Sequence, residues 1–596
     1  MTDILFVQLP LNPQAPLEPT GNTPMASAVL AGTAGLPFHS LLEQDLTDSL
    51  GDRALVREIA SRAPQIVAFS LYCWNSERSS YIAERLREVL PDAVITGGGP
   101  EATADNDWMV RLGAFDLLFQ GEGESSMSRL LSESGPRKPG RGRGTVLIHT
   151  STTGAPSSWV EPYSAGFLDA STGDPVLVET VRGCSSSCSY CAYRRSHPHP
   201  RIIPAAEAVR ILRALKDAGA SEAVFLDPTF NARPDLPLLL EGLAGLDLRC
   251  FGEVRGEWIN PGLAARFAAA GFDSVEIGLQ SMDPEVLRRA GRGGDPADVL
   301  RGAVMLRDAG VKPVVDLILG LPGDTPAGAV RAASALRRAG LHENVQVFYL
   351  ALLPGTEASL MRAPGRMQLP PYYCFDEAEM GGYATAREEM ADILGYDLDL
   401  APRPLVFDGW PGTEVIDPAL PESFPEPSGR PSFRHGVLVF DSDDPWRHRE
   451  TVLALTRERL ALDPFCILDV IFRTGRSFPL DLLDDLRELD NGESYTGRTM
   501  RAMSRDGRLR LCILTGGWRR MERMWLWKAA AECSLVLDAD APEQLPEHLW
   551  DAGAMVRLPG DDIDVRGLAS RVPSVHQVLF RSERIERLWS REILDL

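Results

Sequence analysis

The chain contains 596 residues, of which 44% are hydrophobic and 24% are charged. This length exceeds what one hydrophobic core supports, so we expect several domains. The formal net charge of −22 disfavours a nucleic-acid partner, because an acidic protein repels phosphate. The sequence contains no run of about 18 apolar residues that could cross a bilayer. The first residues read as a strand and not as a targeting signal, so we expect a cytoplasmic protein with no membrane partner.

Residues 1–135 alternate short apolar runs with helical patterns, which predicts an α/β domain with a parallel sheet. The apolar runs are ILFVQLP, IVAFSLY, AVITGGGPE and FDLLFQGEGE. The last two end in glycine-rich loops, and open α/β sheets bind ligands at the carboxyl ends of their strands. We therefore expect a doubly wound, Rossmann-like domain whose glycines let a large flat ligand approach the backbone.

The rest of the chain predicts two more α/β regions. Residues 136–175 form an expected linker, and residues 176–362 contain six strand–helix units, which indicates a partial (β/α)6 barrel of the TIM type. Residues 363–430 are rich in proline and predict a connector or lid with one helix near 376–394. Residues 431–596 return to alternating strands and helices, which predicts a C-terminal α/β domain of unknown role.

Three of the nine cysteines lie within eight residues, just after the first strand of the expected barrel. Cys184, Cys188 and Cys191 form a CxxxCxxC pattern. Three thiolates on one loop cannot complete a tetrahedral zinc site alone, but they can hold three irons of a cubane cluster and leave the fourth iron open. Zinc with a distant histidine such as His197 or His199, or three packing cysteines, is the alternative.

The segment VETVRGCSSSCSYCAYRR resembles the radical S-adenosylmethionine (radical SAM) superfamily. That family carries CxxxCxxC after its first barrel strand, with an aromatic residue, here Tyr190, just before the last cysteine. The resemblance implies that Cys184, Cys188 and Cys191 bind a 4Fe-4S cluster whose open iron chelates SAM. It also implies an external one-electron reductant of the flavodoxin or ferredoxin type, which allows SAM to be cleaved to a 5′-deoxyadenosyl radical.

The same resemblance implies SAM contacts where the later barrel strands end. The second strand ends in LDPTFN, where the family places contacts to the methionine amino group. An arginine on the third strand suits the cofactor carboxylate, because a guanidinium binds carboxylates bidentately; a structural ion pair with a barrel glutamate is its alternative role. The expected SAM-binding residues are Tyr190, Asp227, Thr229, Asn231, Glu253, Arg255, Gln280, Ser281 and Gly320.

The N-terminal domain resembles the cobalamin-binding domain that precedes the barrel in a large class of radical SAM enzymes. The segments TGGGPE, GEGE and SLYCWNSERS resemble the loops that bury the corrin ring and its nucleotide tail. An Asp-x-His-x-x-Gly motif is absent, so bound cobalamin should lack a protein imidazole on its lower face. A degenerate domain that binds nothing is the alternative. The expected cobalamin-binding residues are Tyr72, Cys73, Trp74, Gly97, Gly98, Gly99, Glu101, Gly121, Glu122 and Gly123.

The resemblance to this cobalamin-dependent radical SAM family implies a C-methyltransferase, with methylcobalamin as methyl donor. We expect it to act on an unactivated carbon of a natural-product or peptide substrate, and family analogy alone suggests antibiotic biosynthesis. A cyclisation, ring rearrangement or oxidation, a vestigial cobalamin domain, and a non-catalytic cluster sensor are the alternatives. Transfer-RNA methylthiotransferases need three more cysteines in the N-terminal domain, where this chain has only Cys73. In the C-terminal domain, Trp518, Trp525 and Trp527 line either a substrate site or a helix core.

Overall fold

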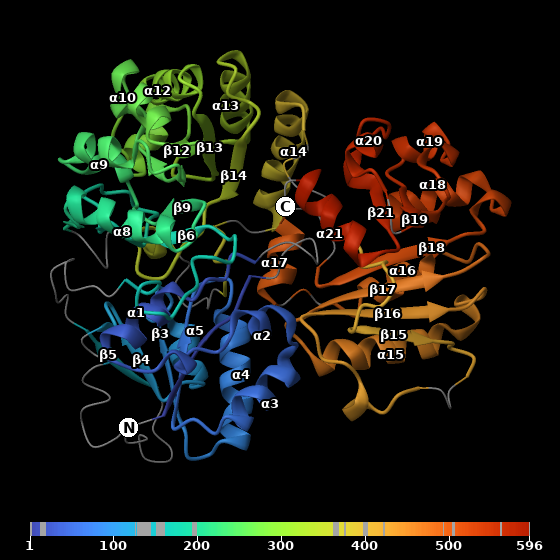
Figure 1. Ribbon diagram of the computed structural model, residues 1–596. Coiled ribbons are helices and arrows are strands. Elements are labelled where there is room, and N and C mark those ends of the chain that lie inside the picture. The colour runs from blue at the N-terminus through green and yellow to red at the C-terminus, as the bar shows by residue number, and fades with distance from the viewer. Residues whose placement is uncertain are drawn as a thin grey trace. The chain divides into compact units, whose positions relative to one another are not determined.

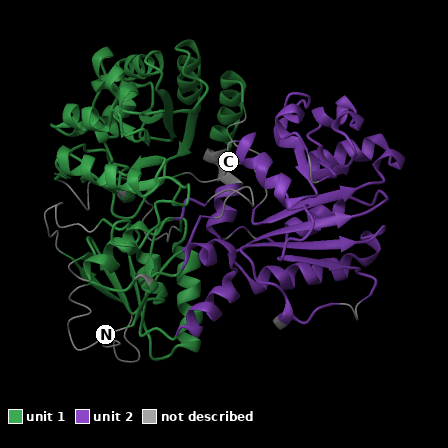
Figure 2. Ribbon diagram, in the orientation of Figure 1, with its two compact units in different colours: residues 1–8, 23–42, 63–399 green, residues 9–22, 43–62, 400–596 purple. Residues whose placement is uncertain are grey.

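The computed structural model of the chain divides into two compact units (Figures 1 and 2). Unit 1 comprises Met1–Gln8, Thr23–Leu42 and Ala63–Asp399, and unit 2 comprises Leu9–Asn22, Glu43–Arg62 and Leu400–Leu596. Among the described helices, none has the length and apolar character needed to span a bilayer. The structure describes residues 3–11, 20–124, 127, 145–150, 161–193, 199–361, 369–374, 377–396, 398, 403–420, 424–490, 492, 494–502, 507–560 and 563–594.

Unit 1 begins with a five-stranded parallel sheet. Its first four strands are short, nearly continuous apolar runs that are buried almost to their last residue, as expected in a parallel sheet, whereas the fifth is exposed at both ends. They lie in chain order, so no reversal of strand order marks a ligand site, and only the carboxyl-end loops point to one. The strands are β1 (Ile4–Gln8), β2 (Ile66–Ser70), β3 (Val94–Gly98), β4 (Leu117–Gln120) and β5 (Val146–His149). The connecting helices are α1 (Met25–Thr33), α4 (Ser76–Val89) and α5 (Asp107–Leu112).

The second part of unit 1 contains the six expected barrel strands. They form two parallel sheets, ordered β10-β9-β6 and β11-β12-β13-β14. Gly252 alone separates β10 from β11, so these two segments continue one interrupted strand and the six positions form an open series. The strands are β6 (Val176–Val178), β9 (Glu222–Phe225), β10 (Arg249–Phe251), β11 (Glu253–Val254), β12 (Ser274–Gln280), β13 (Lys312–Leu319) and β14 (Val345–Tyr349). This arrangement confirms the partial (β/α)6 barrel.

The barrel helices follow their strands as the sequence predicts. Four of them begin alike: a polar N-cap side chain accepts a backbone N–H and a proline opens the first turn, which favours a helix start at that point. The capping residues are Asn260, Asp283, Asp295 and Thr325. The helices are α8 (Ala205–Asp217), α9 (Leu236–Leu243), α10 (Pro261–Ala269), α11 (Pro284–Arg289), α12 (Pro296–Asp308), α13 (Pro326–Arg338) and α14 (Glu377–Leu394).

Unit 2 is built on a seven-stranded parallel sheet, again in chain order. Its first strand lies inside the segment 363–430 that we expected to be a connector. Helices α2 and α3 also belong to this unit, where Arg53 of α3 pairs with Asp463 at 3.3 Å. The strands are β15 (Thr413–Ile416), β16 (His435–Asp441), β17 (Ile467–Arg473), β18 (Leu509–Thr515), β19 (Ser534–Asp538), β20 (Met555–Leu558) and β21 (Val578–Phe580). The helices are α2 (Gln44–Ser49), α3 (Asp52–Ser61), α15 (Arg449–Leu462), α16 (Asp481–Arg487), α17 (Tyr495–Ala502), α18 (Arg523–Glu532), α19 (Glu547–Asp551), α20 (Val565–Ala569) and α21 (Glu583–Glu592).

The tryptophans of the C-terminal segment do not line one common surface. Trp518 and Trp525 pack in or against the core of unit 2, and their indole N–H groups donate to backbone carbonyls, at 3.0 Å for Trp518 and 2.8 Å for Trp525. Trp527 is 52% exposed. Two of the three therefore stabilise the fold, in line with the helix-core reading of this stripe.

Candidate functional site

The three clustered cysteines lie on a loop at the carboxyl edge of the first barrel strand. Residues Val181–Arg182 form β7, which pairs antiparallel with β8 (Arg201–Ile202), and the loop begins directly after β7. The three thiols are half-buried, and none of them forms a disulfide in the described chain. The backbone N–H of Ser186 donates to the sulfur of Cys184 at 3.4 Å. Of the two histidines weighed for a zinc site, His199 is exposed and His197 lies outside the described residues.

Asp227 holds the chain that leads into this loop. Its fully buried carboxylate accepts hydrogen bonds from the backbone N–H groups of Thr180 (2.6 Å) and Val181 (2.8 Å) and from the hydroxyl of Thr180. Burial raises the pKa of Asp227 to about 6, against the lowering effect of these donors. Arg233 donates to the Thr180 hydroxyl at 2.8 Å from the other side. The hydroxyl oxygen of Thr229 lies 3.8 Å from the sulfur of Cys184, at the loop itself.

The far end of the loop is held by residues that sequence reasoning missed. Ser189 donates from its backbone N–H to the carbonyl of Ala290 at 2.9 Å, and the Ser187 hydroxyl donates to the carbonyl of Gly291 at 3.1 Å. Gly291 has φ +67°, and a Cβ there would overlap the carbonyl oxygen of Ser187. The next residue, Arg292, hydrogen-bonds Cys188. The glycine- and arginine-rich sequence RAGRGG was the available signal for this support.

Arg255 is tied into the barrel edge from three directions. The side chain of Asn231 brackets its backbone, accepting from the Arg255 N–H at 2.9 Å and donating to its carbonyl at 3.0 Å. The guanidinium donates to Glu257 at 2.7 Å, to the hydroxyl of Ser186 at 3.2 Å and to the carbonyl of Gly293 at 2.8 Å. The ion pair weighed as the alternative for Arg255 is therefore present, and its partner is Glu257. Through Ser186 this pair also contacts the cysteine loop.

The inner wall of the barrel is acidic. Glu253 on β11 and Glu276 on β12 are register partners, and Asp316 lies on β13 beside them. Burial and the neighbouring Glu276 raise the pKa of Asp316 to about 9. Glu253 is exposed, and desolvation together with Glu276 raises its pKa to about 7. Asp316 therefore holds its proton at neutral pH, and Glu253 is about half protonated there.

Gln280, Ser281 and Gly320 lie at the same carboxyl edge, each in a constrained turn. Gln280 has φ +67° at a bulge in the pairing of β12 with β13. The Ser281 hydroxyl accepts from the backbone N–H of Asp283 at 3.1 Å. Gly320, with φ +85°, donates its N–H to Asp324 at 3.0 Å. These three expected SAM-binding residues thus lie in turns at the carboxyl ends of β12 and β13.

The loop after β2 carries an aromatic platform. The rings of Tyr72 and Trp74 stack with their centroids 4.6 Å apart and their planes 5° apart. Asn75 fixes the turn, because its side chain accepts from the Tyr72 N–H at 2.9 Å and donates to the Ser70 carbonyl at 3.1 Å. Trp74 is 38% exposed. Cys73 separates Tyr72 from Trp74 along the chain. Burial raises the pKa of its thiol to about 12, so this thiol stays protonated.

In the two glycine-rich loops, most positions require glycine because a side chain there would collide with neighbouring residues of the protein. Gly99 has φ +117°, and a Cβ there would lie 2.6 Å from the carbonyl oxygen of Leu71. A Cβ on Gly97 would overlap the Leu71 side chain, and one on Gly123 would lie 3.0 Å from Leu30. Gly121 has φ +99° and faces Thr150 in the same way. Gly98 differs, because a Cβ there would make only ordinary contacts at 3.8 Å.

The two glutamates of these loops face the barrel part of unit 1. Glu101 is 2% exposed and accepts from the phenol of Tyr372 and from Asn106 at 2.9 Å. Glu122 is 7% exposed and pairs with Arg201, while Arg182 lies 3.9 Å away. Both carboxylates therefore join the N-terminal sheet to the barrel. The assignment of both residues to cobalamin stays a prediction, and the sequence alone could not identify these protein partners.

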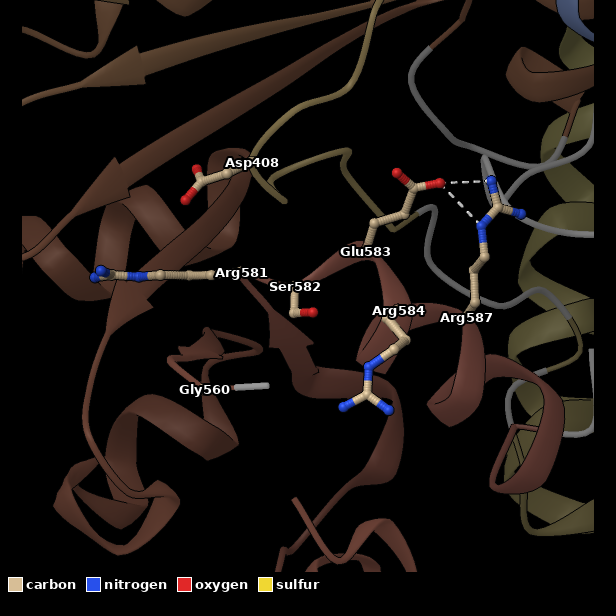
Figure 3. Close-up of a pocket in the computed structure, with 7 residues that line it drawn as sticks. All are labelled: Asp408, Gly560, Arg581, Ser582, Glu583, Arg584 and Arg587. Atoms are coloured by element: carbon tan, nitrogen blue, oxygen red, sulfur yellow. Dashed lines mark hydrogen bonds and ion pairs between the residues drawn. The ribbon is translucent and has the colours of Figure 1, made fainter. Parts of the chain in front are cut away.

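A pocket of about 720 Å³ lies in unit 2, and none of its lining residues was singled out in the sequence (Figure 3). It is lined by Asp408, by Gly560 after β20 and by side chains of the segment 581–587. Two of its arginines are engaged in ion pairs: Arg587 with Glu583 at 2.7 Å and Arg581 with Asp538 at 3.1 Å. This pairing leaves the pocket without a distinctive chemistry.

Family models match both the barrel region and the N-terminal domain. The model of the radical SAM superfamily matches residues 178–354, and the model of the B12 binding domain matches residues 31–131. The chain therefore contains a radical SAM domain, preceded by a B12-binding domain. The cofactors of these two domains are a 4Fe-4S cluster with SAM, and cobalamin. The resemblance stated from the sequence is thereby confirmed.

Similar proteins match part of this radical SAM chain. A 2-(S-pantetheinyl)-carbapenam-3-carboxylate methyltransferase of Streptantibioticus cattleyicolor is 25% identical over 56% of this chain and 56% of its own length. The cobalamin-dependent radical SAM methyltransferase TokK of Streptomyces tokunonensis is 25% identical over 49% of this chain and 47% of its own. The chain thus spans about half the length of these relatives. Among solved structures, the radical SAM methyltransferase TsrM from Kitasatospora setae aligns with a TM-score of 0.48 and 18% identity, over 61% of this chain and 80% of that one.

Proposed function

We propose that this chain is a cobalamin-dependent radical SAM C-methyltransferase that acts on an unactivated carbon of a natural-product or peptide substrate. One observation carries the proposal: the loop after β4 of the B12-binding domain contacts the strand that leads into the cysteine loop, through Glu124 and Arg182 at 2.6 Å. The two cofactor domains are therefore joined at their ligand-bearing edges. The names of the two relatives, both methyltransferases, support methyl transfer over the part of the chain that they match.

The cysteine loop suits an iron–sulfur cluster with one open iron. Cys184, Cys188 and Cys191 would hold it, since three half-buried thiols on one loop give the right ligand number. Arg292 contacts Cys188 and places a positive charge beside the cysteine loop. When both groups are bound, the cluster supplies an electron that cleaves SAM, and cobalamin supplies the methyl group. An external one-electron reductant and the absence of a nucleic-acid substrate belong to this proposal.

The aromatic platform suits the flat ring of cobalamin. Trp74 offers a partly exposed ring face at the carboxyl edge of the sheet, backed by Tyr72. The chain's task there would be to exclude water from the bound ring, and burial keeps the adjacent Cys73 thiol protonated. Gly98, where a side chain would meet ordinary contacts only, leaves room for a ligand at the neighbouring strand.

Eight of the nine expected SAM-binding residues divide into two roles, and Tyr190, on the cysteine loop itself, stays assigned to SAM. Asp227, Asn231 and Arg255 have their polar groups occupied by neighbouring chain, so we assign them to positioning the cysteine loop and the barrel edge. Thr229, next to Cys184, is assigned to direct contact with SAM. Glu253, Gln280, Ser281 and Gly320 are assigned to the same surface because they lie on the inner wall or the carboxyl-edge turns.

Anaerobic reconstitution of the full chain with iron, sulfide and hydroxocobalamin tests the cofactor content. After desalting, we expect about four irons and one cobalt per chain. The variant Cys184→Ala/Cys188→Ala/Cys191→Ala should lose the iron and keep the cobalt. Iron bound without cobalt in the wild-type chain would contradict the cobalamin assignment and favour a vestigial domain.

Methyl-labelled SAM then separates methyl transfer from the other cobalamin-dependent outcomes. The reconstituted, reduced chain is incubated with the labelled cofactor, and the cobalamin fraction is examined by mass spectrometry. We expect the label to appear in that fraction in the wild-type chain. If SAM is consumed while the cobalamin fraction stays unlabelled, a cyclisation, rearrangement or oxidation replaces methyl transfer as the proposed reaction.

A further inference from the structure

Five charged side chains meet where the loop after β4 contacts the hairpin formed by β7 and β8. Arg182 pairs with Glu124 at 2.6 Å and with Glu179 at 2.7 Å, and lies 3.9 Å from Glu122. Arg201 donates to Glu122 at 3.2 Å and makes a second, shorter contact with it. We call this set the ion-pair network; its members are Glu122, Glu124, Glu179, Arg182 and Arg201.

The ion-pair network is largely withdrawn from water. The side chain of Arg182 is 11% exposed and that of Glu122 is 4% exposed, and the other three members are each under 20% exposed. Ion pairs at the surface contribute little, but removing one partner of a buried pair leaves an uncompensated charge and is strongly unfavourable. Separating the loop after β4 from the β7–β8 hairpin would therefore leave buried charges without partners, which is energetically costly.

The hairpin depends on the glutamates from the other domain. Arg182 and Arg201 are direct cross-strand partners in the antiparallel pair. Like charges directly opposite each other destabilise such a pair unless carboxylates lie between or beside them. Glu122 and Glu124, alternating with two glycines in the loop after β4, supply two of the three carboxylates. The hairpin that leads into the cysteine loop is therefore stabilised by the B12-binding domain.

Arg182 is also close to the cysteine loop along the chain. Only Gly183 stands between it and Cys184, and Gly183 has φ +104°, a conformation that favours glycine. Arg182 therefore fixes the point from which the chain enters the first cysteine, one residue away. On the other side, Glu122 and Glu124 lie in the loop that the sequence resemblance assigns to cobalamin.

We propose that the ion-pair network couples the two cofactor sites, so that cobalamin bound to the N-terminal domain strengthens retention of iron by the cysteine loop. This inference rests on the proposed function, because it requires both cofactors to bind. A ligand that orders the loop after β4 also orders Glu122 and Glu124, and through Arg182 it reduces the entropy that the cysteine loop loses on binding iron. Linkage makes the effect reciprocal, so iron also strengthens cobalamin binding. Glu124 and Arg182 are positioning residues in this scheme.

The experiment measures iron loss rather than turnover. The full chain is reconstituted with iron and sulfide, with and without hydroxocobalamin, and the decay of the cluster absorbance is followed after addition of an iron chelator. In the wild-type chain we expect cobalamin to slow iron loss by about fivefold or more. In Glu124→Gln this protection should fall to near unity, and cobalt and iron analysis of each preparation shows which cofactors the variant binds.

Two further variants separate coupling from general damage. Glu207→Gln removes a glutamate that pairs with Arg210 on the exposed face of α8, and it should keep the wild-type protection. Arg182→Lys keeps the charge but loses the planar fork that bonds two carboxylates, so its protection should lie between wild type and Glu124→Gln. If Glu124→Gln fails to fold, the Arg182→Lys measurement decides the matter alone.

The results that would overturn the coupling are distinct from those that would overturn the proposed function. Equal protection in wild type and in Glu124→Gln, or no protection in a wild-type chain that binds both cofactors, contradicts the coupling only. A wild-type chain that binds iron but no cobalamin contradicts both proposals. Desalting followed by cobalt and iron analysis assigns each preparation to one of these cases.

Discussion

Tyr372 donates a hydrogen bond from its phenol to the carboxylate of Glu101, and this bond joins the chain beyond the last barrel strand to the loop after β3. The indole N–H of Trp108 donates to the same phenol oxygen at 2.8 Å. Tyr372 is completely buried, and burial together with Glu101 raises its pKa well above the usual value. The phenol therefore stays a neutral donor, and Glu101 serves the contact between the B12-binding domain and the barrel.

Replacing this phenol should loosen the loop after β3. Tyr372→Phe removes one of the donors to the Glu101 carboxylate and leaves the Trp108 N–H without its acceptor, which costs about 1–3 kcal/mol in the free energy of unfolding. Hydrogen exchange of residues 99–106 should quicken. Tyr396→Phe is the control, because its phenol bonds the backbone of Val345 at 2.8 Å inside the barrel. If both variants leave exchange at residues 99–106 unchanged, the bond between Tyr372 and Glu101 is not stabilising.

Gly121 offers a test of what the glycine-rich loops are for. With φ +99° and a Cβ that would lie 2.7 Å from the Thr150 hydroxyl oxygen, Gly121→Ala meets both backbone strain and a steric overlap. We expect a loss of about 1–3 kcal/mol of stability even with no cobalamin present. Gly113→Ala is the matched control, since φ there is +70° but no close neighbour exists. A Gly121 variant as stable as wild type without cobalamin, but impaired in binding it, would favour a direct ligand role.

Asn231 should affect SAM binding without touching SAM. Asn231→Ala removes both hydrogen bonds that bracket the backbone of Arg255, and a loss of about 1.4 kcal/mol would raise the Kd for SAM about tenfold. Asn260→Ala removes an N-cap of α10 in the same domain, where the side chain accepts from Leu263 at 3.0 Å. This control should lower stability by about 1 kcal/mol and leave SAM affinity unchanged. Equal effects of both variants on the Kd would argue for general destabilisation.

The order of elements was readable from the sequence because it depends on local patterns. Apolar runs such as IVAFSLY and SVEIGLQS became β2 and β12, and proline after a capping residue marked the start of helices such as α12. The cysteine loop was equally clear, because its three ligands are neighbours along the chain. These signals need no knowledge of tertiary contacts.

The partners of individual charges were not readable, because they lie far apart in sequence. Glu101 meets Tyr372 and Glu122 meets Arg201 only after the two domains of unit 1 have come together. Glycines gave a similar difficulty, since a glycine required by a neighbouring carbonyl, as at Gly99, looks the same in sequence as one required by a ligand. Because β15 is short and the hydrophobic pattern around it is weak, the first strand of the seven-stranded sheet of unit 2 was not predicted.

The buried histidine of unit 2 predicts a pH dependence of stability. His435 on β16 lies 2.9 Å from Asp469 on β17, and Arg510 on β18 donates to both side chains. Burial, with the nearby Arg510, lowers the pKa of His435 to about 4. Burial alone would raise the pKa of Asp469, but Arg510 and His435 lower it below its usual value. Asp469 therefore stays ionised over the pH range in which His435 titrates. The imidazole is therefore neutral in the folded chain at neutral pH.

Acidification should destabilise unit 2 through this histidine. Between its usual pKa of about 6.5 and its folded value of about 4, the unfolded chain binds a proton that the folded chain does not, so unfolding is favoured as the pH falls. We expect a loss of about 2 kcal/mol between about pH 7 and pH 4.5, measured by hydrogen exchange of β16, β17 and β18. His435→Gln keeps an amide that can donate to Asp469 but removes the titrating group, so this part of the pH dependence should disappear. His448→Gln, in the same unit, should retain the wild-type slope; if His435→Gln retains it as well, other groups cause the acid sensitivity.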